Sequence, residues 1–341
     1  MTQTEQKQGW RWGVNRWWVL AFIILSAIAA KAYPPIQPHV QLPAETVFHT
    51  GISLFGQELN ITNTIIAMLV ADVILLLIAF GVRRATRDEN AVPKGISGAV
   101  EALLEALYNL TESSAGKWTK QIFPIFATIT LMVLVWNWME LVPGVDSIGW
   151  LEPVKAEGVH GYAKEELLPG LFTIVKGEDQ AENTAVIEDE HTETDEVVHG
   201  YSIVPFVRVA STDLNFTIAL ALIAVAAVQW IGFKANGAGY LTKFWNTKTL
   251  FAVPIFGVID FAVGILELIS EVAKVLSFSF RLFGNIFAGS VLLFVIGSLV
   301  PIFAQSGFLM LEFFIGLIQA IVFGMLTMVF MAQATASHGD H

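Results

Sequence analysis

Cysteine is absent from the 341 residues of this chain, and charged residues make up only 14% of it. A chain without cysteine has no disulfide framework, no thiolate metal site and no cysteine nucleophile. Soluble globular proteins carry about 25% charged residues, so the low charge predicts a chain that lies in membrane lipid. Lysine and arginine are also few, 19 against 30 acidic residues, which argues against nucleic acid as a partner.

The sequence also lacks the common signatures of catalysis and of repeat folds. It contains no P-loop, no zinc-type histidine pair and no Ser-His-Asp grouping that membrane helices would assemble. No repeat of about 20 to 50 residues is visible, and the two halves show no matched pattern of broken helices. An inverted-repeat transporter is therefore not supported, a membrane enzyme is the weakest class, and no cofactor or metal is expected.

Long apolar runs are abundant. A helix needs about 20 apolar residues to cross the hydrocarbon core, and six runs approach or exceed that length: residues 17–30, 64–82, 122–142, 214–233, 250–300 and 308–334. The sequence thus predicts an all-α polytopic membrane protein. The fifth run would be about 75 Å long as a continuous helix, more than twice the membrane thickness, so it must tilt steeply, bend or run partly outside the hydrocarbon core.

The first run has two open interpretations. Lys7, Arg11 and Arg16 precede a short apolar stretch, and Ala30-Lys31-Ala32 follows with small residues in an A-x-A arrangement. This pattern is typical of a secretory signal. Residues 1–32 are therefore expected to be either a cleaved signal peptide or a retained signal-anchor helix, and residues 33–62 an outer segment.

Basic residues near the ends of the runs predict the orientation. They cluster between the second and third runs and between the fourth and fifth, which places both connections in the cytoplasm: Arg83, Arg84, Arg87, Lys94, Lys117 and Lys120, then Lys234, Lys243 and Lys248. Within the first helical block, residues 63–142, the segment 95–117 has helical apolar spacing and is expected to lie at the cytoplasmic interface. The loop 143–212, with 14 acidic and 4 basic residues, then lies outside as a solvated insertion. Residues 213–249 form a membrane helix and a cytoplasmic loop, and the tail 337–341 is cytoplasmic.

The fifth run carries ionisable residues inside the predicted membrane region. A charge at the centre of a membrane helix costs about 2.5–3.5 kcal/mol, so such residues indicate function. At about 100° per residue, the polar side chains fall within an arc of about 80° on a single helix face. They are Asp260, Glu267, Glu271, Lys274, Arg281 and Asn285. An alternative remains open for part of this stripe, because Glu267 or Glu271 at helical spacing would neutralise Lys274 in a structural salt bridge.

Arg281 is not explained by such a salt bridge. The positions three and four residues away are Ser277, Phe278, Gly284 and Asn285, none of them acidic. Arginine keeps its proton, so this side chain requires an anion from another helix or another protein. Gly284 and Gly289 reduce the bulk beside it and would let a neighbouring helix approach.

The last run contributes Glu312 and Gln319, which are seven residues apart and so share one helix face. A carboxylate, an amide and an arginine on adjoining antiparallel helices predict a proton path, which the hydroxyl of Ser290 would extend. Simpler roles also stay open: Gln319 as an interhelical hydrogen bond, Glu312 as an interfacial residue, and Ser290 as a structural hydroxyl.

Four motifs carry a family resemblance. S-F-S-F-R-L-F-G-N-I-F-A-G at 277–289 resembles the arginine-bearing motif of subunit a of the rotary F-type ATP synthase, and L-I-Q-A-I-V-F at 317–323 resembles the last helix of that family. W-N-W-M-E-L-V-P-G at 136–144 and S-T-D-L-N at 211–215 agree as well. Together the motifs cover most of the chain from about residue 63, in the family's order.

The resemblance implies a stator channel of the bacterial inner membrane, not catalytic by itself. Its partners would be a rotating ring of c subunits, each with a membrane carboxylate, the subunit b peripheral stalk and the rest of the F1Fo complex. The last two helices, residues 250–336, would form a long tilted antiparallel hairpin that faces the ring. Arg281 would be the essential gate that attracts a deprotonated ring carboxylate and blocks leakage between two offset half-channels.

Other site residues follow from the same resemblance. Asn285, Gln319, Glu312 and Ser290 would line the outer half-channel, and Glu267, Lys274, Ser277 and Asp260 the inner one. At two outer positions where the family commonly has Glu and His, this chain has Ser290 and Glu312, which leaves one carboxylate for relay. Two other functions remain possible: an ion-coupled secondary transporter that binds an anionic substrate at Arg281, and a purely structural stator whose polar stripe only packs.

Overall fold

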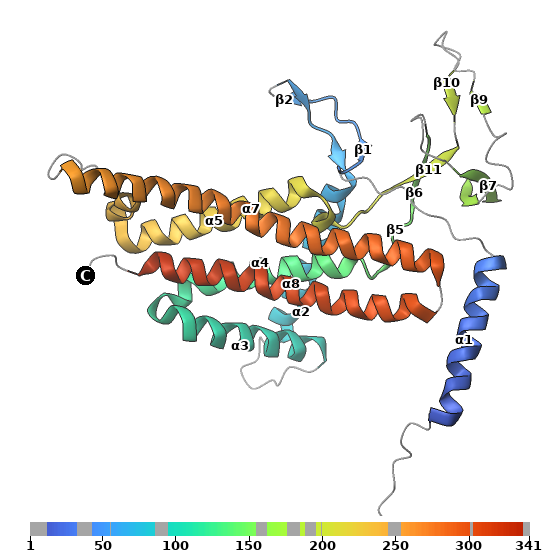
Figure 1. Cartoon of the computed structure of the whole chain (residues 1–341), viewed down its shortest axis with the longest axis horizontal. Coiled ribbons are helices and arrows are strands. Elements are labelled where there is room, and N and C mark those ends of the chain that lie inside the picture. The colour runs from blue at the N-terminus through green and yellow to red at the C-terminus, as the bar shows by residue number, and fades with distance from the viewer. Residues whose placement is uncertain are drawn as a thin grey trace, which may run out of the picture. The chain divides into compact units, whose positions relative to one another are not determined.

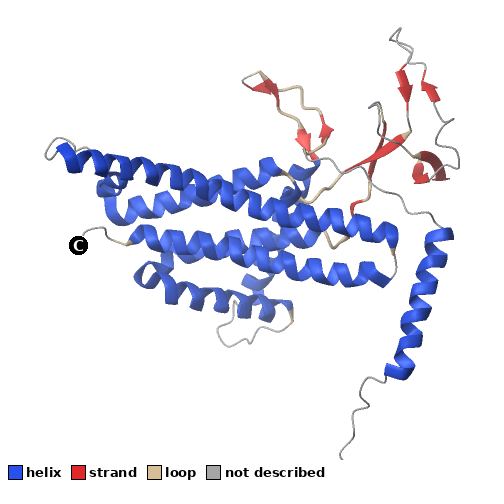
Figure 2. Cartoon of the chain, viewed as in Figure 1, coloured by secondary structure: helices blue, strands red, loops and turns tan. Residues whose placement is uncertain are grey.

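The computed structural model describes residues 12–32, 43–54, 56–85, 95–154, 162–175, 185–187, 196–198, 200–244, 254–300 and 303–336, and these are mostly helical (Figure 2). The helices are α1 (Trp12–Ala32), α2 (Asn63–Ala85), α3 (Ile96–Ala115), α4 (Thr119–Met139), α5 (Leu214–Asn236), α7 (Pro254–Leu299) and α8 (Phe303–Thr335). Three short 3-10 helices are η1 (Gly116–Trp118), η2 (Ala210–Thr212) and η3 (Gly237–Lys243). Each predicted apolar run thus corresponds to a helix, and the predicted helix at 95–117 is α3.

Five helical stretches are long and apolar enough to cross a membrane: residues 63–84, 97–139, 214–236, 261–299 and 304–335. The second joins α3, η1 and α4, because the apolar sequence continues through the short 3-10 turn. These five stretches and the N-terminal helix confirm the predicted fold class. The 46 residues of α7 give a helix about 69 Å long, and its tilt in the bilayer stays a prediction.

The chain divides into two compact units, which are described separately. One contains residues 1–40, 149–204 and 289–312, and the other contains residues 41–148, 205–288 and 313–341. In the second unit α4 contacts α2, α3 and α5, which lie beside it in Figure 1. A buried apolar core joins α4 to α7 and α8 through Val133, Leu282 and Phe323. This core fixes the course of α7 around Arg281.

Close helix contact in the second unit depends on one glycine of α8. A Cβ atom at Gly324 would overlap the hydroxyl oxygen of Thr130 and touch the ring of Phe126, both on α4. Thr130 donates its hydroxyl hydrogen to the carbonyl oxygen of Phe126, at 2.8 Å, so this hydroxyl is paired within α4. Small residues let membrane helices approach in this way.

The strands lie in the segments outside the long helices (Figure 2). Before α2 they are β1 (Thr46–Phe48), β2 (Ser53–Leu54), β3 (Gln57–Glu58) and β4 (Ile61–Thr62). Between α4 and α5 they are β5 (Pro143–Asp146), β6 (Gly149–Pro153), β7 (Ala163–Leu168), β8 (Leu171–Val175), β9 (Ala185–Ile187), β10 (Glu196–Val198) and β11 (Tyr201–Pro205). They form two-stranded sheets, β1-β4, β2-β3, β6-β11, β7-β8 and β9-β10. The sequence did not predict these sheets, because strands of two to six residues interrupted by acidic residues show little alternation.

Candidate functional site

The polar stripe predicted on α7 differs in exposure along its length. Glu271 is buried, with 7% of its surface exposed, whereas Glu267, Lys274 and Arg281 are half-buried. Ser277 and Asn285 are exposed. Asp260 belongs to α7, but its side chain lies outside the described part of the structure. The stripe therefore runs along the border between the packed and the uncovered faces of the helix.

Lys274 is neutralised within its own helix. Its Nζ donates a hydrogen bond to Glu271 Oε1 at 2.8 Å, one helical turn away. The same ammonium lies 4.8 Å from the centroid of the Phe330 ring on α8, a cation–π contact. The alternative of a structural salt bridge is thus correct for Lys274, with Glu271 as its partner.

Arg281 has a different environment. Its Nη2 donates a weak hydrogen bond to Ser277 Oγ at 3.4 Å, and no carboxylate among the described residues pairs with it. A Cβ atom at Gly284 would have no heavy atom within 4 Å, so the structure is open beside the arginine. The guanidinium is therefore charged, half-buried and without an anion among the described residues.

Packing on the adjacent face of α7 holds this arginine in place. Phe278, Leu282 and Ile286 are at most 2% exposed and recur every four residues. The Phe278 ring lies 5.2 Å from that of Phe323 on α8, and the hydroxyl groups of Ser279 and Thr217 on α5 are 3.1 Å apart. The backbone that carries Arg281 is thus fixed by two neighbouring helices.

Glu312 of α8 lies directly against the backbone of α7. A Cβ atom at Gly289 would overlap its carboxylate group, so only glycine leaves room for this side chain. Glu312 is 5% exposed, and its Oε1 has no hydrogen-bond partner among the described residues. Ser290, next in the chain to Gly289, is 6% exposed. The structure thus brings the predicted carboxylate beside the segment that carries the predicted hydroxyl.

Gln319 is half-buried on α8, and it belongs with Arg281 and Asn285 to the larger compact unit. Ser290 and Glu312 belong to the other unit. No group of three or more His, Asp or Glu residues in the described ranges is placed to hold a metal ion.

Three residues that the sequence analysis gave no role fasten α8 in place. Asn137 Nδ2 donates to the carbonyl oxygen of Gly316 at 3.2 Å, and Asn137 Oδ1 accepts from Ser211 Oγ at 2.7 Å. Trp138 Nε1 donates to the carbonyl oxygen of Phe313 at 3.1 Å, with the two rings stacked 4.6 Å apart. The sequence did contain a signal for these contacts, because the amide of Asn137 and the indole N–H of Trp138 lie in an apolar run and buried donors require partners.

A further polar contact lies outside the membrane helices. Asp146 has a left-handed backbone, φ 58°, which is uncommon for residues other than glycine. Burial raises the pKa of its carboxyl group to about 6, although nearby Arg208 and the backbone N–H of Val209 act to lower it. Arg208 also donates to the carbonyl oxygen of Pro43 at 3.1 Å, which connects the segment before α2 to the approach to α5.

Comparison with known sequences covers most of the chain. The family model described as ATP synthase A chain matches residues 64–332, from the first turn of α2 to the last turn of α8. The chain is 26% identical over 298 residues to ATP synthase subunit a of Mycobacterium marinum, which covers 86% of this chain and 94% of that relative. It is 26% identical over 317 residues to ATP synthase subunit a of Gloeobacter violaceus, covering 92% and 98%. The corresponding protein of Desulforamulus reducens is 35% identical over 148 residues, 41% of this chain and 52% of that relative.

Proposed function

Because this chain belongs to the ATP synthase subunit a family, the multi-pass, non-catalytic proton-channel stators of Fo, we propose that Arg281 is its gate between two half-channels. Its relatives are bacterial proteins, which implies the cell membrane. Subunit a works with partners of the F1Fo complex. The finer assignment of residues and partners below is our proposal.

The observation that carries the proposal is the lack of a carboxylate partner for Arg281 among the described residues. Arginine does not lose its proton, and an uncompensated cation in a membrane is costly. Deprotonated carboxylates of a passing c ring would supply the anion. The apolar face of α7 near the arginine is uncovered, with Leu276 48% and Phe280 53% exposed, as contact with a ring requires.

We propose the following proton path. A proton from the outside protonates Glu312 and passes to a ring carboxylate, and Ser290, Asn285 and Gln319 line this outer half-channel. The neutral ring site then turns into the lipid. A protonated site that arrives from the lipid on the inner side releases its proton toward Glu267, because Arg281 stabilises the resulting carboxylate. Asp260, Lys274 and Ser277 line the inner half-channel, in which Lys274 is held by Glu271.

The partners follow from this path. The hairpin of α7 and α8 faces the c ring, and the remaining helices contact the subunit b stalk. The basic ends of α2 and α5 support a cytoplasmic C-terminus. Membrane lipid covers the surfaces that no subunit covers.

The test is proton flux in membranes that hold the complete complex with Arg281→Ala. ATP-driven pumping should be lost, while passive flux after removal of F1 should persist or rise. Ser270→Ala, which changes an exposed side chain of α7 that the proposed path does not use, is the control and should pump. Undiminished pumping by Arg281→Ala would contradict the gate and favour a structural stator. Transport of an anionic substrate without a rotor would favour a secondary transporter.

A further inference from the structure

The β7–β8 hairpin ends in an apolar tip, residues 167–172, which neither the gate nor the proton path uses. The sequence of this hairpin tip is L-L-P-G-L-F. Its four large side chains are all exposed: Leu167 60%, Leu168 62%, Leu171 53% and Phe172 39%. Turns that face water usually carry polar residues such as Asn, Asp and Ser. The composition of the tip therefore indicates that it lies in a medium other than water.

The hairpin tip is apolar on both of its faces. Leu171 and Phe172 follow each other in β8, and successive side chains of a strand point to opposite faces. Leu168 pairs with Leu171, so one face carries two exposed leucines, while the other carries the exposed ring of Phe172. A protein surface packed against one face would leave the other face in water. An apolar medium that surrounds the tip covers both faces, and lipid is such a medium.

The turn itself offers few unpaired donors to an apolar medium. Pro169 has no backbone N–H. The N–H of Gly170, whose φ is 83°, donates to Glu166 Oε1 at 3.2 Å. An N–H group that leaves water without an acceptor costs free energy, so this hydrogen bond lowers the cost of moving the turn out of water.

A lysine and two aromatic rings lie behind the tip. Lys164 Nζ lies 3.8 Å from the centroid of the Phe172 ring and 5.6 Å from that of the Tyr201 ring. Lys164 comes about 10 Å of strand before Leu168. Tyrosine is enriched at membrane–water interfaces, and lysine lays its stem along apolar groups while its ammonium stays on the water side. The spacing thus matches a tip that enters the interface and a lysine that stays at the level of the lipid phosphates.

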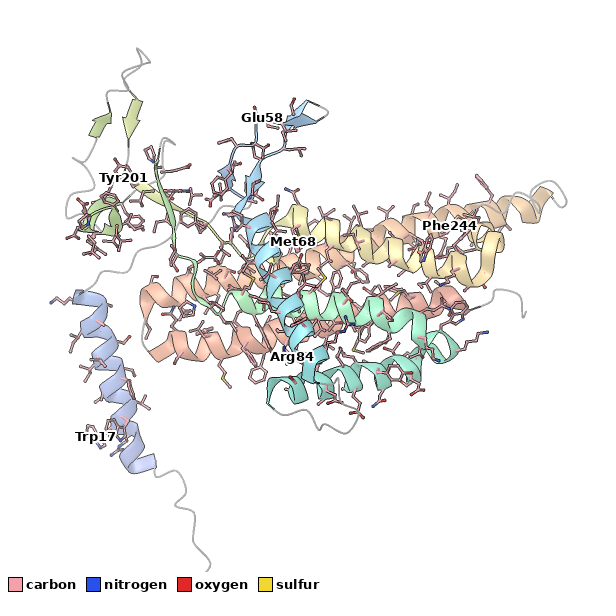
Figure 3. All side chains as sticks on the ribbon, turned by 180° about the vertical axis from the view of Figure 1, so that it is seen from behind. Trp17, Glu58, Met68, Arg84, Tyr201 and Phe244 are labelled. Carbon is pink, nitrogen blue, oxygen red and sulfur yellow. The ribbon has the colours of Figure 1, made fainter. Side chains whose placement is uncertain are left out.

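The hairpin is long enough to reach the membrane surface. Tyr162, just before β7, forms a bridge with Tyr201, the first residue of β11, which Figure 3 labels. β11 has five residues, about 17 Å, and is followed by η2, which contacts α2 and α4. β7 has six residues, about 20 Å. A hairpin that starts beside Tyr201 can therefore span the length of β11.

We propose that the hairpin tip inserts into the outer leaflet of the membrane that this chain spans. Leu167, Leu168 and Leu171 enter the boundary between headgroups and acyl chains to a depth of about 5–10 Å, as other interfacial elements do, and Lys164 contacts lipid phosphates. The tip thereby holds an acidic segment, with 14 acidic and 4 basic residues between 143 and 212, at the membrane surface. The inference depends on the proposed orientation of this segment and not on the gate at Arg281.

Fluorescence quenching in the complete complex in proteoliposomes tests the insertion. The chain has no cysteine, so an introduced thiol is the only one in this subunit. Leu168→Cys carries the dye NBD at the tip, and Glu152→Cys, which is exposed on β6, carries it as the control. Aqueous iodide should quench the Leu168→Cys label about fivefold less than the control label, and phospholipids with a nitroxide near the headgroup should quench only the Leu168→Cys label.

Two results would overturn the proposal. Equal quenching of both labels by iodide would show that the tip lies in water. Protection of the Leu168→Cys label from iodide without quenching by the nitroxide lipids would show that protein covers the tip.

A pair of substitutions beside the label tests the apolar character of the tip. Leu171→Asp puts a charge on the cross-strand neighbour of Leu168, whereas Leu171→Phe keeps that position apolar. Leu171→Asp should raise iodide quenching of the Leu168→Cys label to the level of the control label, and Leu171→Phe should leave it protected, because a charge is costly away from water. Protection that persists with Leu171→Asp would overturn the proposal. Arg281→Ala should leave the quenching unchanged, so failure of the gate and failure of the insertion are distinguished.

Discussion

Two cations of α7 lie two helical turns apart and differ in what neutralises them. Lys274 has an internal partner, Glu271, at 2.8 Å, and it also lies over the Phe330 ring. Among the described residues, the guanidinium of Arg281 has a single polar partner, the hydroxyl of Ser277 at 3.4 Å. A lysine that meets its carboxylate within one turn needs nothing from outside, whereas the arginine is left available for an external anion. A charge inside a membrane therefore points to a partner outside the chain only where the chain itself leaves that charge unpaired.

Giving Arg281 an internal carboxylate should erase this difference and produce the largest effect. Ser277→Asp replaces the hydroxyl that accepts the hydrogen bond from the Arg281 guanidinium with a carboxylate. Arg281 would then be neutralised as Lys274 is, and ATP-driven pumping should fall about a hundredfold, as for removal of one preorganised charge. Ser277→Asn introduces a side chain of nearly the same size as aspartate but without its charge. This variant serves as the control and should pump at more than half the wild-type rate. Similar pumping by both variants would show that Arg281 does not need to be unpaired.

A second test concerns the position of Glu312. Gly289→Ala puts a methyl group where the carboxylate lies, so Glu312 must move. A displaced relay group should lower pumping about tenfold, because proton transfer depends on position to within about 1 Å. Gly307→Ala on α8, where the added methyl group meets no atom within 4 Å, is the matched control. The pumping rates of inverted vesicles with equal subunit a content distinguish Gly289→Ala from Gly307→Ala. Equal rates would contradict the role of Glu312 as a proton relay.

Removing the carboxylate partner of Lys274 should impair assembly of the subunit more than proton transport. Glu271→Gln leaves the half-buried ammonium of Lys274 without its carboxylate, which should destabilise the subunit by about 2 kcal/mol. Quantitative immunoblots of washed membranes should show a severalfold lower level of subunit a. The double variant Glu271→Gln with Lys274→Gln removes both charges and should restore most of that level. If the double variant is no better than the single one, the pair does not stabilise α7.

The contrast between Lys274 and Arg281 was largely predictable, because it depends on local spacing. Partners three and four residues away share a helix face, and the sequence shows one acidic residue there for Lys274, Glu271, but none for Arg281. The long helices were predictable for a similar reason, since each apolar run is continuous. The run 122–142 becomes α4 at 119–139, which ends before Pro143.

Contacts between distant parts of the chain were not predictable. The contact between Glu312 and Gly289 joins α8 to α7. The side chain of Asn137 donates a hydrogen bond to a carbonyl oxygen 179 residues away in the sequence. No local pattern specifies such pairs. The pairing of β6 with β11 was missed because its partners lie about 50 residues apart in an acidic segment.

The smallest effect on pumping is expected at Asp146, a charge outside the membrane helices. Burial raises the pKa of its carboxyl group from 3.8 to about 6 in the folded protein, so the folded state binds the proton more tightly than the unfolded state. Its contribution to stability is therefore complete below about pH 4 and is lost as the pH rises through about 6. Asp146→Asn, which is neutral and tolerates the left-handed backbone, should equal wild type near pH 4 and be more stable at pH 7. The temperature at which subunit a is released from the complex, measured from pH 5 to 8, should fall with rising pH in wild type and much less in the variant. Parallel curves would mean that Arg208 already compensates the charge of Asp146, which would then resemble Lys274 in being neutralised by its own chain.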